Sequence, residues 1–192
     1  MGISIYYSGM LRNPSLITAL IDEARDIADS HHWDWSELPT VPEIPIRGII
    51  IQPADCDPVF LTFHRDGYLC NPILFSFLLE HAPQDISLDA KQYLVTKTQY
   101  AGAETHMQLI RFLRFLSEKY FNRFELTDDS QFWESGDENY CRKRFGQGER
   151  IQDLLDLALE SYKTKSKDSA EIFKDLKQQL DNELGEPREG LN

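Results

Sequence analysis

Hydrophobic and polar positions along the chain form one pattern that occurs twice. Two short apolar stretches, 3–9 and 93–102, each end in a tyrosine, a small residue and a glycine. Each stretch is followed by residues whose apolar positions recur every three or four places, which is the spacing of an amphipathic helix. The pattern therefore predicts two β-turn-α units, with helices over about 14–31 and 103–120.

The segments between and after the two units also carry recognisable patterns. Residues 33–45 contain three prolines and no helical period, which predicts an ordered loop. β-branched and aromatic runs bounded by turn residues predict further strands, and apolar residues at helical spacing predict further helices. The predicted strands are 46–51, 59–63 and 124–127, and the predicted helices begin near 71, 138 and 169.

This order of elements predicts an α+β fold. We expect a ferredoxin-like split β-α-β sandwich with one mixed or antiparallel sheet and two helices on one face. The sandwich domain is expected over residues 1–136. Residues 137–192 are expected to form a C-terminal helical extension, whose weakly apolar helices would pack against a second copy or a partner protein.

Topology predicts where a site would lie. If each helix joins two parallel strands, the loops that follow those strands emerge at the same edge of the sheet. Residues 100–106 should then lie near 128–137, and residues 7–12 near 55–57. The first of these edges gathers polar and aromatic side chains, and its candidate ligand-binding residues are Tyr100, Glu104, His106, Trp133, Glu134 and Asp137.

Several chemistries fit these residue types. Glu104, His106, Glu134 and Asp137 would suit Zn, Mn or Ni as mixed nitrogen and oxygen ligands. Alternatively, His106 and Glu134 would act as base and orienting carboxylate in a hydrolase. A third hypothesis, not tied to these residues, is a regulatory domain that binds an anionic metabolite at a helix N-terminus. The simplest reading is structural, because acids are stabilised in the first turn of a helix.

The leading interpretation is a non-catalytic binding or assembly module, with no metal assigned and no cofactor identified. The alternative is a metal-assisted hydrolase or small-molecule enzyme at the Tyr100 edge. The sequence holds no glycine-rich phosphate loop, nucleophile elbow, zincin helix or EF-hand loop.

Composition narrows the partners and the compartment. The chain has 192 residues and a net charge of −12, which disfavours nucleic acid and anionic lipid. A basic stripe at 111–123 and a basic cluster at 142–144 are expected to pair with nearby acids. Without a long apolar run or a secretory signal, we expect a cytoplasmic protein that does not enter membranes. Three cysteines without metal or disulfide spacing agree with that expectation.

Overall fold

The computed structural model describes residues 2–39, 45–81, 93–164, 174 and 177–178. The chain divides into two compact units, Met1–Phe145 and Gly146–Asn192. The first unit extends beyond residue 136 because Cys141 and Phe145, on the first turns of the last helix, are buried in its core. The helix predicted from residue 169, and with it most of the predicted C-terminal contact surface, lies outside the described residues.

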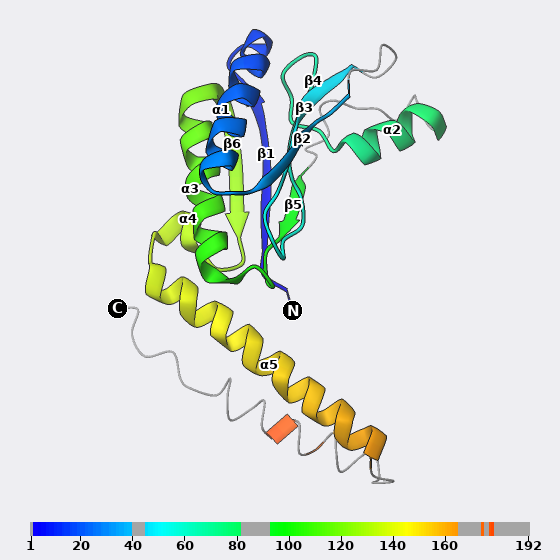
Figure 1. Cartoon of the computed structure of the whole chain (residues 1–192), viewed down its shortest axis with the longest axis vertical. Coiled ribbons are helices and arrows are strands. Elements are labelled where there is room, and N and C mark those ends of the chain that lie inside the picture. Colours follow the sequence, from blue (N-terminus) through cyan, green and yellow to red (C-terminus); the bar gives the residue numbers. More distant parts are fainter. Residues whose placement is uncertain (1, 40–44, 82–92, 165–173, 175–176, 179–192) are drawn as a thin grey trace. The chain divides into compact units, whose positions relative to one another are not determined.

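The first unit is α+β (Figure 1). Its first half contains β1 (Ser4–Leu11), a single 3-10 turn, α1 (Ile17–Ser30), β2 (Asp34–Glu37), β3 (Ile46–Gln52) and β4 (Val59–His64). Then follow α2 (Pro72–His81), β5 (Leu94–Lys97), α3 (Gly102–Tyr120), β6 (Phe121–Asp128), α4 (Phe132–Ser135) and α5 (Glu138–Thr164), which continues into the second unit.

The strands form two antiparallel three-stranded sheets, in the orders β5-β1-β6 and β2-β3-β4. In the first sheet, β1 lies between β5 and β6 and is antiparallel to both. β5 and β6 are therefore parallel to each other, and α3 connects them. The second of the two predicted strand–helix–strand units is thus present, with β1 inserted between its strands.

The two sheets are joined at three levels. At one end, the Asp57 amide donates to the Lys97 carbonyl over 2.9 Å. At the other end, residues 67–70 bond both to β1 and to β4, through contacts such as the Leu69 amide to the Gly9 carbonyl at 2.9 Å. Between these levels, the buried Tyr7 hydroxyl accepts from the Phe60 amide at 2.9 Å and donates to the Phe60 carbonyl at 3.2 Å.

The first predicted strand–helix–strand unit differs from the expectation. Residues 34–37, predicted as part of a loop, form β2 and pair with β3. This additional strand reverses the chain, so β3 runs opposite to β1. The segment 68–70 is antiparallel to both β1 and β4, which makes β4 parallel to β1. Because β3 is antiparallel to β4, it is also antiparallel to β1. The prediction that residues 7–12 and 55–57 share an edge was therefore wrong, because they lie at opposite ends of β1.

The main core lies between the sheets and the helices α1 and α3. Alternate residues of β1, among them Ile5 and Tyr7, face this core and are fully buried, whereas Tyr6 between them is exposed. The apolar positions of α1 that recur at helical spacing are buried as predicted: Ile17, Leu20, Ile21, Ala24 and Ala28. Trp33 completes this layer with its ring against Phe112.

Candidate functional site

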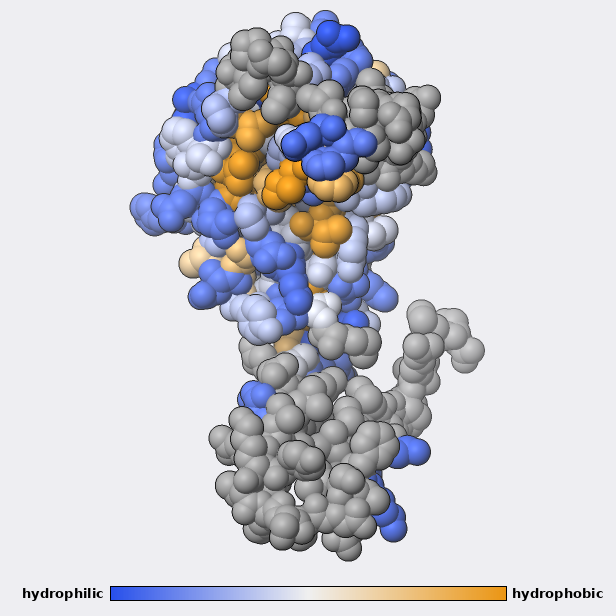
Figure 2. Space-filling model, turned by 90° about the vertical axis from the view of Figure 1, so that its right-hand side faces the viewer, coloured by the Kyte–Doolittle hydropathy of each residue, from blue (hydrophilic) through white to orange (hydrophobic). Residues whose placement is uncertain are grey.

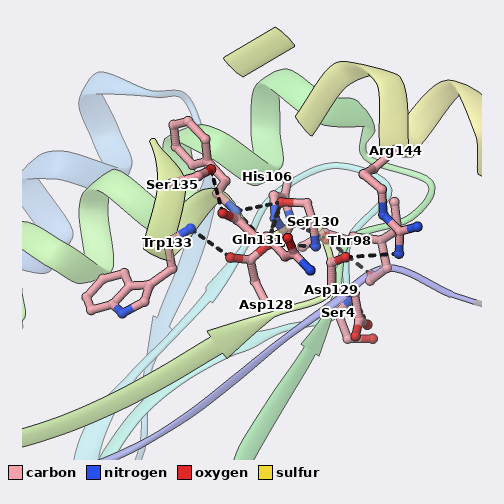
Figure 3. Close-up of polar contacts among 12 residues, drawn as sticks. Ser4, Thr98, His106, Asp128, Asp129, Ser130, Gln131, Trp133, Ser135 and Arg144 are labelled. Carbon is pink, nitrogen blue, oxygen red and sulfur yellow. Dashed lines mark hydrogen bonds and ion pairs between the residues drawn. The ribbon is translucent and has the colours of Figure 1, made fainter. Parts of the chain in front are cut away.

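The ends of β5 and β6 meet beside the first turns of α3, and polar side chains gather there (Figure 3). Thr98 follows β5, Asp128 is the last residue of β6, and His106 lies on α3. The prediction that residues 100–106 and 128–137 lie together at one edge is confirmed by the contact between His106 and Asp128. It holds because β5 and β6 are parallel, so that both chains leave the sheet at the same edge.

His106 is the centre of this polar cluster. Its Nδ1 atom lies 2.7 Å from the Thr98 hydroxyl, and its Nε2 atom lies 2.9 Å from the Ser130 hydroxyl and 3.1 Å from Asp128 Oδ1. Ser130 also donates to Asp128 Oδ1. Both ring nitrogens of His106 are thus engaged by hydrogen-bonding side chains. We call these four residues, Thr98, His106, Asp128 and Ser130, the His106 network.

Asp128 orders the turn that follows β6. Its Oδ1 atom accepts from the Ser130 amide at 2.8 Å, and its Oδ2 atom accepts from the Trp133 amide at 2.8 Å. Burial by itself raises the pKa of this carboxyl group, but the hydrogen bonds from His106, Ser130 and Trp133 outweigh burial. The pKa of Asp128 therefore falls to about 2, and the carboxylate is ionised at neutral pH.

The His106 network is closed to solvent. The side chains of His106 and Asp128 have no exposed surface, and Thr98 and Ser130 are also fully buried. The ring of Phe145 covers the imidazole at a centroid distance of 5.2 Å. Each polar group is satisfied inside the protein, as buried polar groups must be. The arrangement ties β5, α3, β6 and α4 together rather than presenting a reactive group to a substrate.

The other predicted site residues lie around the network without entering it. Tyr100 is 71% exposed and precedes α3. Glu104 forms an ion pair with Arg142 at 2.8 Å. Trp133 on α4 is half-buried under the Arg114 guanidinium, and Asp137 accepts from the Tyr140 amide at 3.0 Å, which caps α5. Glu134 is exposed on α4.

A hollow of about 390 Å³ lies beside the network, and Asp128, Gln131, Glu134 and Ser135 line it. Gln131 adopts a left-handed backbone with φ of 60°, which turns the chain from β6 into α4. Of the predicted site residues, only Glu134 borders this hollow. His106 is not among the residues that line it.

The residues proposed as metal ligands are separated by these contacts. Within the described residues, no three His, Cys, Asp or Glu side chains gather in a way that could hold a metal ion. His106 has no ring nitrogen directed to an open position, and Glu104 is engaged by Arg142. The donor set at this edge therefore does not match a metal centre, which needs several free ligands around one point.

The basic stripe is paired with acids at three of its four residues, which agrees in part with the prediction. Three side chains of the stripe and Arg142 of the following cluster contact carboxylates: Arg111 with Glu138, Lys119 with Glu23, Arg123 with Glu125, and Arg142 with Glu104 and Glu138. Arg114 instead donates to the Trp133 carbonyl. The positive charge of this surface is therefore offset locally.

Sequence reasoning did not single out Thr98 and Ser130, and it placed Asp128 nearby without a role. The sequence did contain a signal that could have identified these partners of His106. A histidine on the apolar side of a predicted helix needs buried partners, and hydroxyl and carboxyl groups directly after the two flanking strands are placed to supply them.

The chain matches no protein-family model, no curated protein and no solved structure. In the part of the chain that the structure describes, no helix combines the length and the apolar character of a membrane span. Any functional conclusion must therefore come from the surfaces and contacts described above.

Proposed function

We propose that this protein is a non-catalytic binding module that binds another protein through the exposed apolar face of α2. The observation that carries the proposal is that Ile73, Leu74 and Phe77 are exposed by 70%, 44% and 56%. Large apolar side chains gathered on a protein surface mark interaction sites, whereas single exposed ones need no explanation.

The three side chains lie on one face of α2. At 100° per residue, Phe77 lies between Ile73 and Leu74 around the helix axis, and Phe75 points to the opposite side. Phe75 is buried with Ile46 and Cys70, so α2 is attached to the sheet β2-β3-β4 by the face that it does not expose. Figure 2 views the molecule from the side on which α2 lies in Figure 1, and it shows hydrophobic residues gathered in the upper half of that view.

The start of α2 is capped, which stabilises the helix that carries the exposed face. The Asn71 side chain accepts from the amides of Ile73 at 2.9 Å and Leu74 at 3.1 Å. Pro72 occupies the first helical position, where a missing amide costs no hydrogen bond. An apolar face on a helix that is already formed suits a partner that presents a complementary apolar segment, because the helix itself need not be ordered on binding.

The closed His106 network supports the non-catalytic part of the proposal. A catalytic base must come within hydrogen-bonding reach of its substrate, and His106 is buried with both nitrogens engaged. The three cysteines are free thiols. Burial raises the pKa of Cys56 and Cys70 to about 12 and also raises the pKa of Cys141, so none is an activated nucleophile.

We also propose that the fold is ferredoxin-like and that the protein is cytoplasmic. The position of β1 between the parallel strands β5 and β6 supports the ferredoxin-like fold, since a split β-α-β unit is part of that arrangement. Three free thiols support the cytoplasmic location, because thiols persist in reducing compartments.

The metal-assisted hydrolase is the competing hypothesis, and it would require His106 to leave its network. Elemental analysis of protein purified without chelator distinguishes the two. A stoichiometric metal that is lost in His106→Gln but retained in Glu80→Gln, an exposed carboxylate on α2, would favour the hydrolase over the binding module.

The binding proposal is tested with the full chain and the double variant Ile73→Lys/Phe77→Lys. Proteins that the wild type retains from a lysate are identified, purified and titrated against it by calorimetry. We expect the double variant to bind such a partner about tenfold or more weakly, since an anchor residue at an interface contributes ~1–2 kcal/mol or more.

Tyr100→Lys is the control, because it places a lysine at an exposed aromatic residue outside α2. It should bind the purified partner like the wild type. Equal affinities of the wild type and the double variant for every purified partner would overturn the proposal, as would the absence of any partner that binds the wild type directly.

A further inference from the structure

Two glycines inside α5, Gly146 and Gly148, are the basis of this inference. The helix runs without interruption from Glu138 to Thr164, so both glycines lie in its interior. Glycine is a poor residue for this position, because it loses the most conformational freedom when it becomes helical. Each glycine lowers the equilibrium constant for helix formation about fivefold relative to alanine. Two of them within one turn make this turn the weakest of α5, which contains no other glycine and no proline.

Packing does not explain either glycine. Among the described residues, a Cβ atom at Gly146 or Gly148 would have no neighbouring chain segment within 4 Å. Neither glycine is among those with a positive φ, so the backbone of both positions also suits other residues. What the two glycines supply to this turn is therefore conformational freedom.

The turns of α5 that precede the glycines are fixed on the α+β unit. Cys141 and Phe145 are buried in its core, and the ring of Phe145 lies on the imidazole of His106. Phe145 is also the last residue of the first compact unit, and Gly146 is the first residue of the second. The weak turn thus begins directly after the last residue that anchors the helix in the core.

We propose that Gly146 and Gly148 form a hinge within α5. The turns over 138–145 stay on the α+β unit, and the turns over 149–164 change direction when the hydrogen bonds of the hinge turn open. Sharp bends in helices arise at glycine pairs, and a hinge consists of a few residues that absorb the change in φ and ψ beside a rigid body. Because Phe145 precedes the hinge, α5 bends without uncovering the His106 network.

Hydrogen exchange of the full chain, measured for each amide by NMR, tests the hinge. In an α-helix the amides of residues 150–152 bond to the carbonyls of 146–148, so they report the opening of this turn. We expect these amides to be the least protected between residues 142 and 158, with better protected amides on both sides. This minimum distinguishes a hinge from fraying of the helix end, in which protection falls steadily toward Thr164.

The double variant Gly146→Ala/Gly148→Ala should raise the protection factors of residues 150–152 about tenfold or more, because alanine favours the closed turn at both positions. Gln147→Ala is the matched control, since it changes the residue between the glycines and keeps both of them. It should alter these protection factors by no more than about twofold. Gln147→Gly, which adds a third glycine, should lower them about threefold.

A distance measurement shows whether the opening bends the helix. Spin labels are placed at the exposed positions of Asn139→Cys and Asp153→Cys, which are about 21 Å apart along a straight α-helix. Cys56→Ser removes the half-buried native thiol, and the other two cysteines are buried. With the glycines present, the distance distribution should extend to values shorter than that of the straight helix. The double alanine variant should give one narrow peak.

The hinge is refuted if protection falls along α5 without a minimum near 146–148. It is also refuted if the distance distribution has the same width with and without the two glycines. Circular dichroism establishes that each variant is folded before these measurements. The variants do not alter α2, so the result for the hinge is independent of the result for the proposed partner surface.

Discussion

Tyr7 shows how much one side chain contributes to the joining of the two sheets. Its hydroxyl group bonds both the amide and the carbonyl of Phe60 at a level where neither backbone reaches the other. Burial is the main influence on this phenol and raises its pKa well above the usual value. The neighbouring Tyr6 points to the opposite face and is exposed, so the alternation along β1 gives adjacent tyrosines different roles.

The substitution Tyr7→Phe should lower the free energy of unfolding by about 1–3 kcal/mol, because it leaves both backbone groups of Phe60 buried without a partner. Urea denaturation followed by tryptophan fluorescence measures this change. Tyr6→Phe removes the same atom from an exposed ring and should change stability by less than about 0.5 kcal/mol. Equal effects of the two variants would contradict the bridging role of Tyr7.

At the scale of elements, β3 and β4 approach each other closely because Gly48 has no side chain. Gly48 pairs with Thr62, and a Cβ atom at Gly48 would lie 2.2 Å from the Leu61 carbonyl oxygen and 2.5 Å from the Thr62 Cα atom. These are backbone atoms and cannot rotate away. A glycine inside a β-branched strand, which by itself weakens the strand, is here required by the neighbouring backbone.

We therefore expect Gly48→Ala to destabilise the protein by about 1–3 kcal/mol or more, since the two strands must separate to admit the methyl group. Gly146→Ala is the matched control, because nothing lies within 4 Å of a Cβ atom at that position of α5. That substitution should favour helix by ~0.5–1 kcal/mol. Thermal unfolding followed by circular dichroism should show shifts of opposite sign, and shifts of the same sign would contradict the close approach.

At the scale of the whole molecule, the His106 network joins segments that are far apart in the chain. The Thr98 hydroxyl contacts the Ile3 carbonyl as well as His106, and Asp128 holds the amides that lead into α4. The start of β1, the end of β5, α3 and the end of β6 are thus connected through one ionised carboxylate. Its protonation should therefore affect the unfolding of the entire α+β unit.

The direction of this pH dependence follows from the lowered pKa of Asp128. The pKa is about 2 in the folded protein and 3.8 for the ordinary carboxyl group. The stabilisation is therefore fully present above about pH 5 and is lost as the pH falls toward 2, with a total of about 2 kcal/mol. Asp128→Asn should show a shallower decrease in stability over this pH range, measured by urea denaturation at successive pH values.

Asp26→Asn serves as the control, because Asp26 is exposed on α1. This variant should keep the pH dependence of the wild type. If Asp128→Asn also kept it, the carboxylate would not be the group whose protonation weakens the fold.

Some elements of the fold could be predicted from the sequence pattern, and others could not. The apolar spacing in 14–31 and 103–120 was sufficient to predict α1 and α3, and β-branched runs were sufficient for β3 and β4, because these elements bury one face against a single core. β2 was missed. Its residues Asp34, Ser36 and Glu37 are exposed, so the strand carries almost no apolar signal and forms through its backbone pairing with β3.

The sequence by itself determined the local elements of this protein, the turn chemistry between them and the meeting of the β5 and β6 ends, because each follows from short-range spacing and from one parallel crossover. The tertiary structure decided the direction of β3, the bridging role of Tyr7 and the burial of His106. These depend on which strands become neighbours, and backbone hydrogen bonds between distant segments leave no periodic trace in the chain. At a solvent-exposed sheet edge, a histidine in the position of His106 could bind a ligand. Here the edge is buried, and His106 instead connects structural elements through its hydrogen bonds.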